Sequence, residues 1–196
     1  MKNHHHYLSQ LFKDIDWSEK AIEATEFDNC TFIGCNFSNT QFLKCKFHEC
    51  HFINCNLSLI KVAKCSFFDT LFEECKAIGI NWTNAAWPNI KLNCPLRFTK
   101  CILNDSSFLG LSLQEMSMVE CKAHDVDFRD ADFTQADFSH TDFTHSLFSK
   151  TILKEANFSE AINYDINIFQ NDVKRAKFTL PEAMSLLQHL DIELLD

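Results

Sequence analysis

Residues 131–143 read ADFTQADFSHTDF, and their phenylalanines Phe133, Phe138 and Phe143 stand five residues apart. The same step holds along most of the chain, since seventeen of its 20 phenylalanines lie on two such tracks. One track runs over residues 27–92 and the other, shifted by one residue, over residues 98–178. A period of five matches neither an α-helix nor a flat strand, so it predicts a stacked repeat.

A small residue stands two positions before each large one, as Ala131 does before Phe133 and Cys30 before Phe32. The other three positions of a unit are mostly polar. We therefore expect each five-residue unit to point one large and one small side chain into a core. The remaining three positions would face solvent.

The pattern at residues 131–143, a small residue followed by aspartate and phenylalanine, resembles the pentapeptide-repeat proteins. The resemblance covers about residues 22 to 180. It implies an all-β fold, a right-handed quadrilateral parallel β-helix with four units in each coil. With twenty residues in a coil, the repeat would form a solenoid of about eight coils.

The repeat divides the chain into three parts. Residues 1–21 are expected to form an N-terminal cap, residues 22–178 the β-helix, and residues 179–196 a C-terminal α-helix and tail. A solenoid that is stabilised by nearest-neighbour contacts needs a cover at each end. Because there is one core and no low-complexity linker, we expect a single domain.

Both ends carry helical signals. Tyr7, Leu8, Leu11 and Phe12 have i, i+4 spacing, which predicts a short helix over the first coil. At the other end, Thr179-Leu180-Pro181-Glu182 has the spacing of a capping box and precedes an apolar stretch.

A phase break near residues 93–98 separates the two tracks, where the step from Leu92 to Phe98 is six instead of five. The break coincides with Cys94 and Pro95. Because proline removes a ladder donor, we expect a bulge or kink there. The frame is otherwise almost unbroken, with no insertion long enough to form a protruding loop.

Nine of the ten cysteines occupy the small inward position, and only Cys94 does not. Their spacing in multiples of five lacks the two-residue gaps of zinc ligands. Pairs twenty apart, such as Cys35 and Cys55, would lie on neighbouring coils at a separation that permits a disulfide. We expect free thiols that pack as small buried hydrophobes, because a reducing cytosol disfavours the bridges.

The net charge of −9 lies entirely in the second half of the chain. Residues 1–97 hold ten basic and ten acidic residues, residues 98–180 eight and thirteen, and residues 181–196 none and four. With twenty residues in a coil, four aspartates would form a belt around the rod, and three others with one histidine a column along it. The belt comprises Asp127, Asp132, Asp137 and Asp142, the column comprises Asp105, Asp125, His145 and Asp165, and Asp130 completes the candidate partner-binding acids.

These acids favour a binding function. An acidic rod repels nucleic acid and suits a basic, DNA-binding surface on a protein partner. The alternative is that aspartate before phenylalanine is simply common in this repeat and that the carboxylates are solvated.

The closing stretch, residues 161–187, resembles that of the Qnr and MfpA group of pentapeptide-repeat proteins. The resemblance implies a dimer formed by C-terminal helices that binds DNA gyrase and topoisomerase IV as a DNA mimic and protects them from quinolones or peptide toxins. Qnr proteins also carry protruding loops, which this frame lacks. The candidate dimerisation residues are Met184, Leu187, Leu190, Ile192 and Leu194, although a helix that only covers the last coil is the alternative.

Two non-enzymatic functions are therefore consistent with the sequence: a topoisomerase-binding dimer, or a scaffold for an unrelated partner that uses Ile33 and Ile53 on the neutral half. We expect no enzyme, because three glycines provide no phosphate-binding loop and a convex rod lacks a pocket. We also expect no catalytic residue, cofactor or metal, and no direct binding to nucleic acid or membrane. A cytoplasmic location is expected, since no apolar segment is long enough for a signal peptide or a membrane span.

Overall fold

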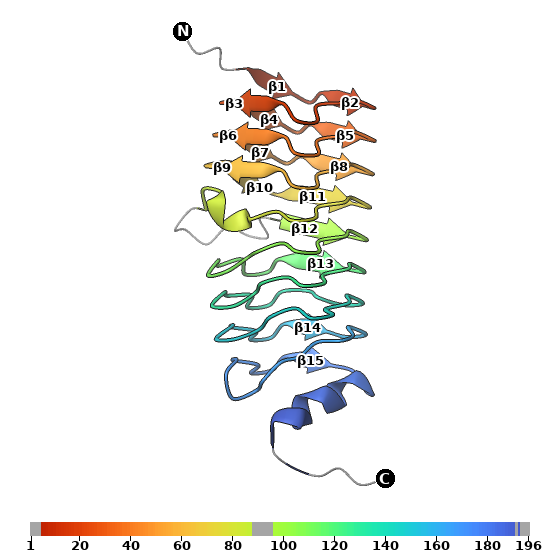
Figure 1. The fold of residues 1–196 in the computed structure, drawn as a ribbon, viewed down its shortest axis with the longest axis vertical. Coiled ribbons are helices and arrows are strands. Elements are labelled where there is room, and N and C mark those ends of the chain that lie inside the picture. The colour runs from red at the N-terminus through yellow and green to blue at the C-terminus, as the bar shows by residue number, and fades with distance from the viewer. Residues whose placement is uncertain (1–4, 88–95, 191, 193–196) are drawn as a thin grey trace.

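Equivalent five-residue units lie one above another, twenty residues apart. Phe27 pairs in register with Phe47, and Phe32 pairs with Phe52, both in parallel strands. The computed structural model describes residues 5–87, 96–190 and 192, and it is a parallel β-solenoid of about eight coils (Figure 1). The repeat interpretation of the Phe tracks is thus confirmed.

Each coil has four sides, and the strands of each side stack into a parallel sheet or a row of bridges. The first side comprises β1 (His6–Leu8), β4 (Glu26–Asp28), β7 (Lys46–His48), β10 (Ser66–Phe68) and then Ser112, Asp132, Ile152 and Asp172 in bridges. The second comprises β2 (Leu11–Lys13), β5 (Thr31–Ile33), β8 (His51–Ile53), β11 (Thr70–Glu73), β12 (Leu96–Thr99), β13 (Ser117–Val119), β14 (Asn157–Phe158) and β15 (Lys177–Phe178). The third is a row of single bridges that runs from Asp16 to Ile162. The fourth comprises β3 (Ala21–Glu23), β6 (Gln41–Leu43), β9 (Lys61–Ala63), the 3-10 turn η1 (Trp82–Asn84) and then Ser107, Asp127 and Leu147 in bridges.

The large central residues fill the bore. Phe27 stacks on Phe47 at a ring-centroid distance of 5.2 Å, and it meets Phe32 of its own coil edge to face at 5.4 Å. Both geometries are favourable for aromatic pairs. Because Phe27, Phe32 and Phe47 are almost fully buried, each contributes about 1.5–3 kcal/mol of hydrophobic stabilisation.

The residue at the small inward position forms hydrogen bonds to the backbone as well as packing in the core. The backbone N–H of Cys55 donates to Cys75 Sγ at 3.3 Å, and Cys75 Sγ in turn donates to the carbonyl of Phe52 at 3.4 Å. Elsewhere Thr or Ser hydroxyls make the same bonds, as Thr141 does with Cys121 N and Met118 O. This explains why the position alternates among cysteine, threonine and serine.

The nine described cysteines are buried and free, as the sequence predicts, while Cys94 lies outside the described residues. Burial raises the pKa of the Cys50 thiol to about 12. Such a thiol is protonated at neutral pH and therefore unreactive as a nucleophile.

The corners between sides are formed by residues with positive φ, and their side chains leave the rod. Asn29, Lys64 and Asp125 adopt φ values of 49°, 56° and 55°. Gly79 occupies such a corner, where a Cβ would lie 2.6 Å from Leu59 Cδ2 and would displace that exposed side chain. Charged side chains at the corners therefore project from the rod into solvent.

The expected N-terminal cap is wrong for the described residues of the segment. Residues from His6 onward form β1, β2 and β3 of the first coil, with Tyr7 stacked on Phe27 at 5.4 Å and Phe12 on Phe32 at 4.8 Å. The helical spacing is coincidental, because the five-residue step simply continues backward. The inward residues of this coil are Tyr7, Phe12, Trp17 and Ile22.

The phase break contains more than a one-residue bulge. Phe72 pairs with Phe98, so this coil is 26 residues long, six more than its neighbours. Ala86 still donates to the carbonyl of Cys65 in the ordinary register, and Arg97 pairs with Leu71. The extra residues therefore fall between Ala86 and Arg97, and the expectation of no insertion of loop length is wrong. A period of five conceals one complete added unit. The predicted bulge at Cys94 and Pro95 lies outside the described residues.

The C-terminal helix is present as the 3-10 helix η2 (Glu182–Leu190) instead of an α-helix. Thr179 and Glu182 do not form the predicted capping box. Thr179 Oγ1 accepts from Glu160 N at 2.7 Å, and Glu182 Oε1 accepts from Asn163 N at 2.6 Å. The two side chains fasten η2 to the preceding coil, and it lies across that end of the rod (Figure 1). None of the helices in the described ranges has the length and apolar character that crossing a bilayer requires.

Candidate acidic interface

The four belt aspartates lie on four sides of the rod, as predicted, but each is used to close its own turn. Asp132 Oδ1 accepts from Thr134 N at 2.9 Å and from Thr134 Oγ1 at 2.6 Å. Asp137 Oδ1 accepts from Ser139 N at 3.1 Å. Aspartate commonly bonds to the backbone two residues on, which stabilises a turn.

The belt aspartates also tie neighbouring coils together. Gln114 Nε2 donates to Asp132 Oδ2 at 2.5 Å, and Asn157 Nδ2 donates to Asp137 Oδ1 at 3.0 Å. Partial burial raises the pKa of Asp132, but hydrogen bonds from Thr134 and Gln114 outweigh it and leave the pKa below its usual range. These carboxylates are ionised at neutral pH, and much of their hydrogen-bonding capacity is already used.

Asp127 is neutralised by its neighbour. Arg129 Nε and Nη2 donate to Asp127 Oδ1 and Oδ2 at 2.9 and 2.8 Å, a bidentate pair. This hydrogen bonding lowers the pKa of Asp127. The belt as a whole is therefore a structural feature, in line with the alternative explanation that aspartate belongs to the repeat.

Three other aspartates are placed differently. Asp105, Asp125 and Asp130 occupy corners, with φ between 55° and 59°, and are exposed. Within the described residues, the carboxylates of Asp105 and Asp130 accept no hydrogen bond, and Asp125 contacts only His145 Nδ1, at 3.7 Å. We call Asp105, Asp125 and Asp130 the corner carboxylates. They flank the fourth side, because Asp105 and Asp125 precede it and Asp130 follows it.

The predicted column is correct for three of its four members. Asp105 N donates to His124 O and Asp125 N to Thr144 O, so Asp105, Asp125 and His145 stack on successive coils. Asp165 leaves the column because Phe148 pairs with Ile166, only 18 residues on, although the register is 20 again at Ile152 and Asp172. Its carboxylate instead lies 2.7 Å from His189 Nε2 of η2. For the same reason Ile166, and not Ile168, is the buried residue of that unit.

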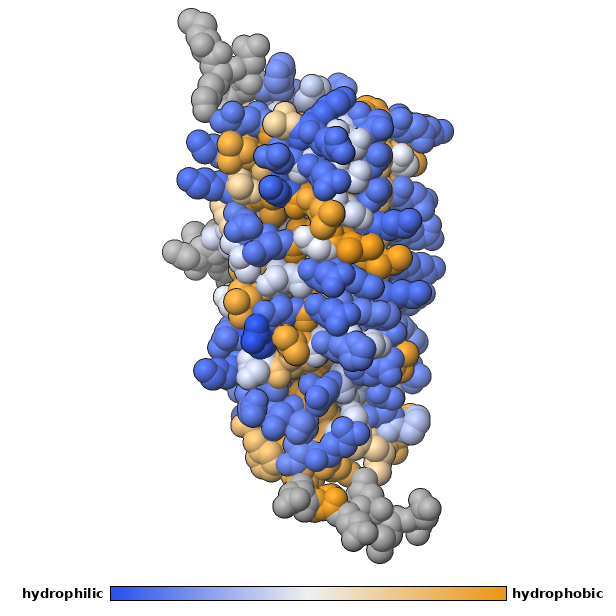
Figure 2. All heavy atoms as spheres, in the orientation of Figure 1, coloured by the Kyte–Doolittle hydropathy of each residue, from blue (hydrophilic) through white to orange (hydrophobic). Residues whose placement is uncertain are grey.

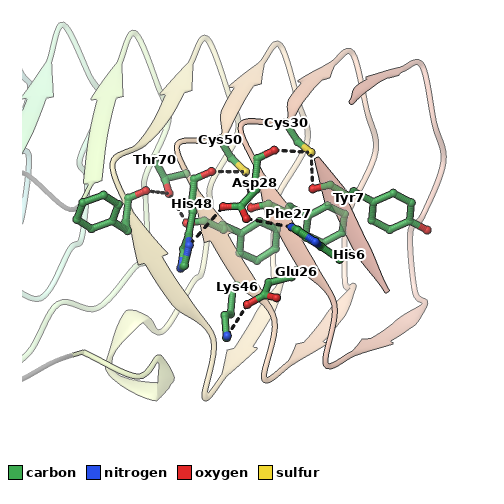
Figure 3. A network of polar contacts seen from close by, with 12 residues as sticks. His6, Tyr7, Glu26, Phe27, Asp28, Cys30, Lys46, His48, Cys50 and Thr70 are labelled. Atoms are coloured by element: carbon green, nitrogen blue, oxygen red, sulfur yellow. Dashed lines mark hydrogen bonds and ion pairs between the residues drawn. The ribbon is translucent and has the colours of Figure 1, made fainter. Parts of the chain in front are cut away.

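Several acids of the N-terminal half are matched by bases. On the first side, Asp28 lies between His6 Nε2 at 3.0 Å and His48 Nδ1 at 3.4 Å, and Lys46 donates to Glu26 (Figure 3). Glu19, Glu49 and Glu74 also occupy exposed corners of that half, so what sets the corner carboxylates apart is their place in the half that carries the net charge.

The candidate dimerisation residues lie on or after η2. Met184 and Ile192 are 44 % and 54 % exposed, whereas Leu187 and Leu190 are partly buried. Leu194 lies outside the described residues. Leu186 faces inward and packs on the core. Figure 2 shows apolar atoms at this end of the rod, as well as in patches along its length.

Among residues 5–87, 96–190 and 192, no three His, Cys, Asp or Glu side chains are grouped to hold a metal ion. The main features that the sequence interpretation missed are the turn-closing aspartates. Their signal is an aspartate or asparagine followed two positions later by serine or threonine, as at Asp142 and Thr144.

A family model described as "Pentapeptide repeat region" matches residues 25–95 and 94–158. Two trypsin-treated forms of QnrB1, a plasmid-mediated fluoroquinolone resistance protein, are similar in structure. One has 19 % identity and a TM-score of 0.69, and the match covers 99 % of this chain and 100 % of that chain. The other has 20 % identity and a TM-score of 0.65, and the match covers 98 % of this chain and 92 % of that chain. HetL, a pentapeptide-repeat protein involved in heterocyst differentiation regulation in the cyanobacterium Nostoc sp. strain PCC 7120, has 14 % identity and a TM-score of 0.63, covering 87 % and 85 %. No curated protein matches. At such identities, the structural likeness establishes the fold.

Proposed function

This chain belongs to the pentapeptide-repeat family, and on that premise we propose that it is a non-enzymatic, dimeric binding protein of the cytoplasm that engages DNA gyrase or topoisomerase IV in place of DNA. Protection of that enzyme from quinolones or peptide toxins is the proposed outcome. The likeness to QnrB1, a fluoroquinolone resistance protein, supports this choice, because it extends over nearly the whole chain.

The observation that carries the proposal is the set of corner carboxylates. Asp105, Asp125 and Asp130 are exposed and lie on two adjacent corners of the acidic half. Fixed negative charge spaced along a rigid rod attracts a basic, DNA-binding surface and speeds its association. The belt aspartates contribute to the field but are committed to turns.

The C-terminal end supports the proposed dimer. Met184 and Ile192 expose apolar surface beside η2, together with parts of Leu187 and Leu190, and Leu194 follows in the sequence. A two-fold axis there would bury this surface and place the two acidic halves on either side of the centre.

A scaffold for an unrelated partner is the second candidate. Ile33 and Ile53 pair in register on the second side, and both are half-buried. The likeness to HetL, which acts in differentiation regulation, shows that this fold also serves other functions. Such a scaffold would bind independently of the corner carboxylates.

A DNA gyrase supercoiling assay with the added protein, with and without a quinolone, tests the proposal. We expect the wild-type chain to alter supercoiling or the drug effect, and D105N/D125N/D130N to lose this activity. Asp127 and Asp132 are left unchanged because their loss would disturb turns.

The matched control is E19Q/E49Q/E74Q, which removes the same charge from exposed corners of the N-terminal half. An aspartate variant that stays fully active would overturn the mimicry proposal and favour the scaffold. Loss of activity in both variants would indicate a general charge effect.

A further inference from the structure

The neutral N-terminal half conceals a basic surface. Lys44 and Lys64 occupy successive corners of the fourth side, since Lys44 N donates to Ala63 O and Lys64 N to Asn84 O. Lys61 begins β9 of the same side, opposite Gln41 of β6. All three lysines are exposed, and none forms an ion pair within the described residues.

Apolar side chains lie among these lysines. Leu43, next to Lys44 on β6, is 36 % exposed, and Leu59, at the other corner of the same side, is 52 % exposed. Contact surfaces between proteins commonly combine an apolar centre with a charged rim. We call Leu43, Lys44, Leu59, Lys61 and Lys64 the lysine patch.

Most acids of this half point elsewhere. Glu26 and Asp28 lie on the first side with their own bases, and Asp69 pairs with Arg97. Glu73 of the second side contacts His51. On the fourth side, the acids are Glu19 at a corner and Glu23 on β3, and both come before the patch. The equal counts of acids and bases in residues 1–97 therefore correspond to a real separation of charge.

The lysine patch and the corner carboxylates lie on the same side of the rod. From Lys64 the corner continues through Asn84 and Gly110, and Gly110 N donates to Arg129 O, next to Asp130. Three coils separate Lys64 from Asp130, about 14 Å at the usual strand spacing. One partner that lies along the fourth side can therefore meet both charges at once.

We propose that the lysine patch is a second docking surface, which binds an acidic region of the protein partner beside the basic region that the corner carboxylates engage. The inference rests on the proposed function. It extends that function from an acidic rod to a rod that presents a basic and an acidic surface on the same side. A partner helix with acids at i and i+4 has carboxylates about 5–6 Å apart, which matches the spacing of lysines on successive coils.

A protein surface fits this patch better than duplex DNA does. The patch has three lysines and no arginine, it includes two leucines, and it lies on a chain of net charge −9. Duplex DNA is bound mainly through many phosphate contacts, and an acidic rod repels it.

The test is the binding of DNA gyrase holoenzyme to the immobilised full-length chain by biolayer interferometry. We expect K44E/K61E/K64E to weaken binding by about tenfold, mostly through slower association, because charge reversal at a rim acts on the encounter. K44Q/K61Q/K64Q should show a smaller loss. The matched control K13E/K76E/K177E changes the same charge at exposed lysines on the second and third sides and should bind like the wild type. Melting curves would verify that each variant is folded.

The outcomes separate the two proposals. If the wild type binds and K44E/K61E/K64E binds equally well, the proposal that the lysine patch is a docking surface is wrong, while the proposed function stands. If the wild type does not bind gyrase, both are overturned. Fluorescence anisotropy with a labelled DNA duplex provides a further check, since duplex binding that the lysine variant loses would identify a phosphate-binding surface and overturn the inference.

Discussion

His124 Nε2 lies 2.8 Å from Asp142 Oδ2, so a histidine–aspartate pair joins two successive coils of the acidic half. Asp142 Oδ1 also accepts from Thr144 N at 3.1 Å and from Asn163 Nδ2 at 2.9 Å. Partial burial raises the pKa of Asp142, but these hydrogen bonds outweigh it and hold the pKa at about 2. One carboxylate thus connects three coils.

Asp142 should make stability depend on pH in acid. Its pKa is lower in the folded chain than the ordinary value of about 3.9, so its contribution is complete above about pH 4 and is lost as the pH falls toward 2. We expect D142N to be less stable than the wild type by about 1 kcal/mol at pH 7 after allowance for solvent screening. Urea unfolding at several pH values measures this difference. A gap that stays constant between pH 7 and pH 2.5 would contradict the assignment.

The hydrogen bonds of the buried cysteines lead to a second prediction. Cys75 Sγ accepts from Cys55 N and donates to Phe52 O, so C75A would leave buried backbone groups without partners. We expect C75A to cost about 1–3 kcal/mol in the free energy of unfolding. C75S keeps the hydrogen bonds and should cost less. If serine is as damaging as alanine in urea unfolding, the position serves packing alone.

The proposed dimer depends on the apolar surface beside η2. M184K/I192K should convert the dimer to a monomer, because two buried charges without partners oppose association. Light scattering coupled to size-exclusion chromatography measures the mass. L8K/L11K is the matched control, since Leu8 and Leu11 are 62 % and 64 % exposed at the opposite end of the rod. A wild-type chain that is monomeric at micromolar concentration would exclude this interface.

The period of five predicted a stacked repeat, and the family resemblance implied the β-helix. The stacking of Phe27 on Phe47 is one of the contacts that hold successive coils together. The same period is insensitive to a complete added unit, so it could not distinguish a bulge from the 26-residue coil that ends at Phe98. It also could not locate Asp165, which lies beside a local register of 18 that returns to 20 by Asp172. Insertions and deletions show in a periodic sequence only as their remainder after division by five.

The candidate site was predictable in part. The charge asymmetry directed attention to the second half, and the twenty-residue spacing correctly placed Asp105 next to Asp125 on successive coils. Counting alone could not separate Asp132, whose oxygens close a turn, from Asp130, whose carboxylate stands free at a corner within the described chain. That difference depends on backbone conformation at each position. Totals over residues 1–97 likewise hid the segregation of Lys44, Lys61 and Lys64 onto one side.

The 26-residue coil has a consequence for engineering. The hydrogen bond from Ala86 to Cys65 and the pairing of Arg97 with Leu71 show that the ladder is intact on both sides of the added residues. A corner of this rod can therefore host foreign sequence at little cost, provided that the chain re-enters in phase. Peptide epitopes or recognition loops grafted at chosen corners would be displayed at heights set in steps of about 4.8 Å. The packing of the scaffold's core would stay unchanged.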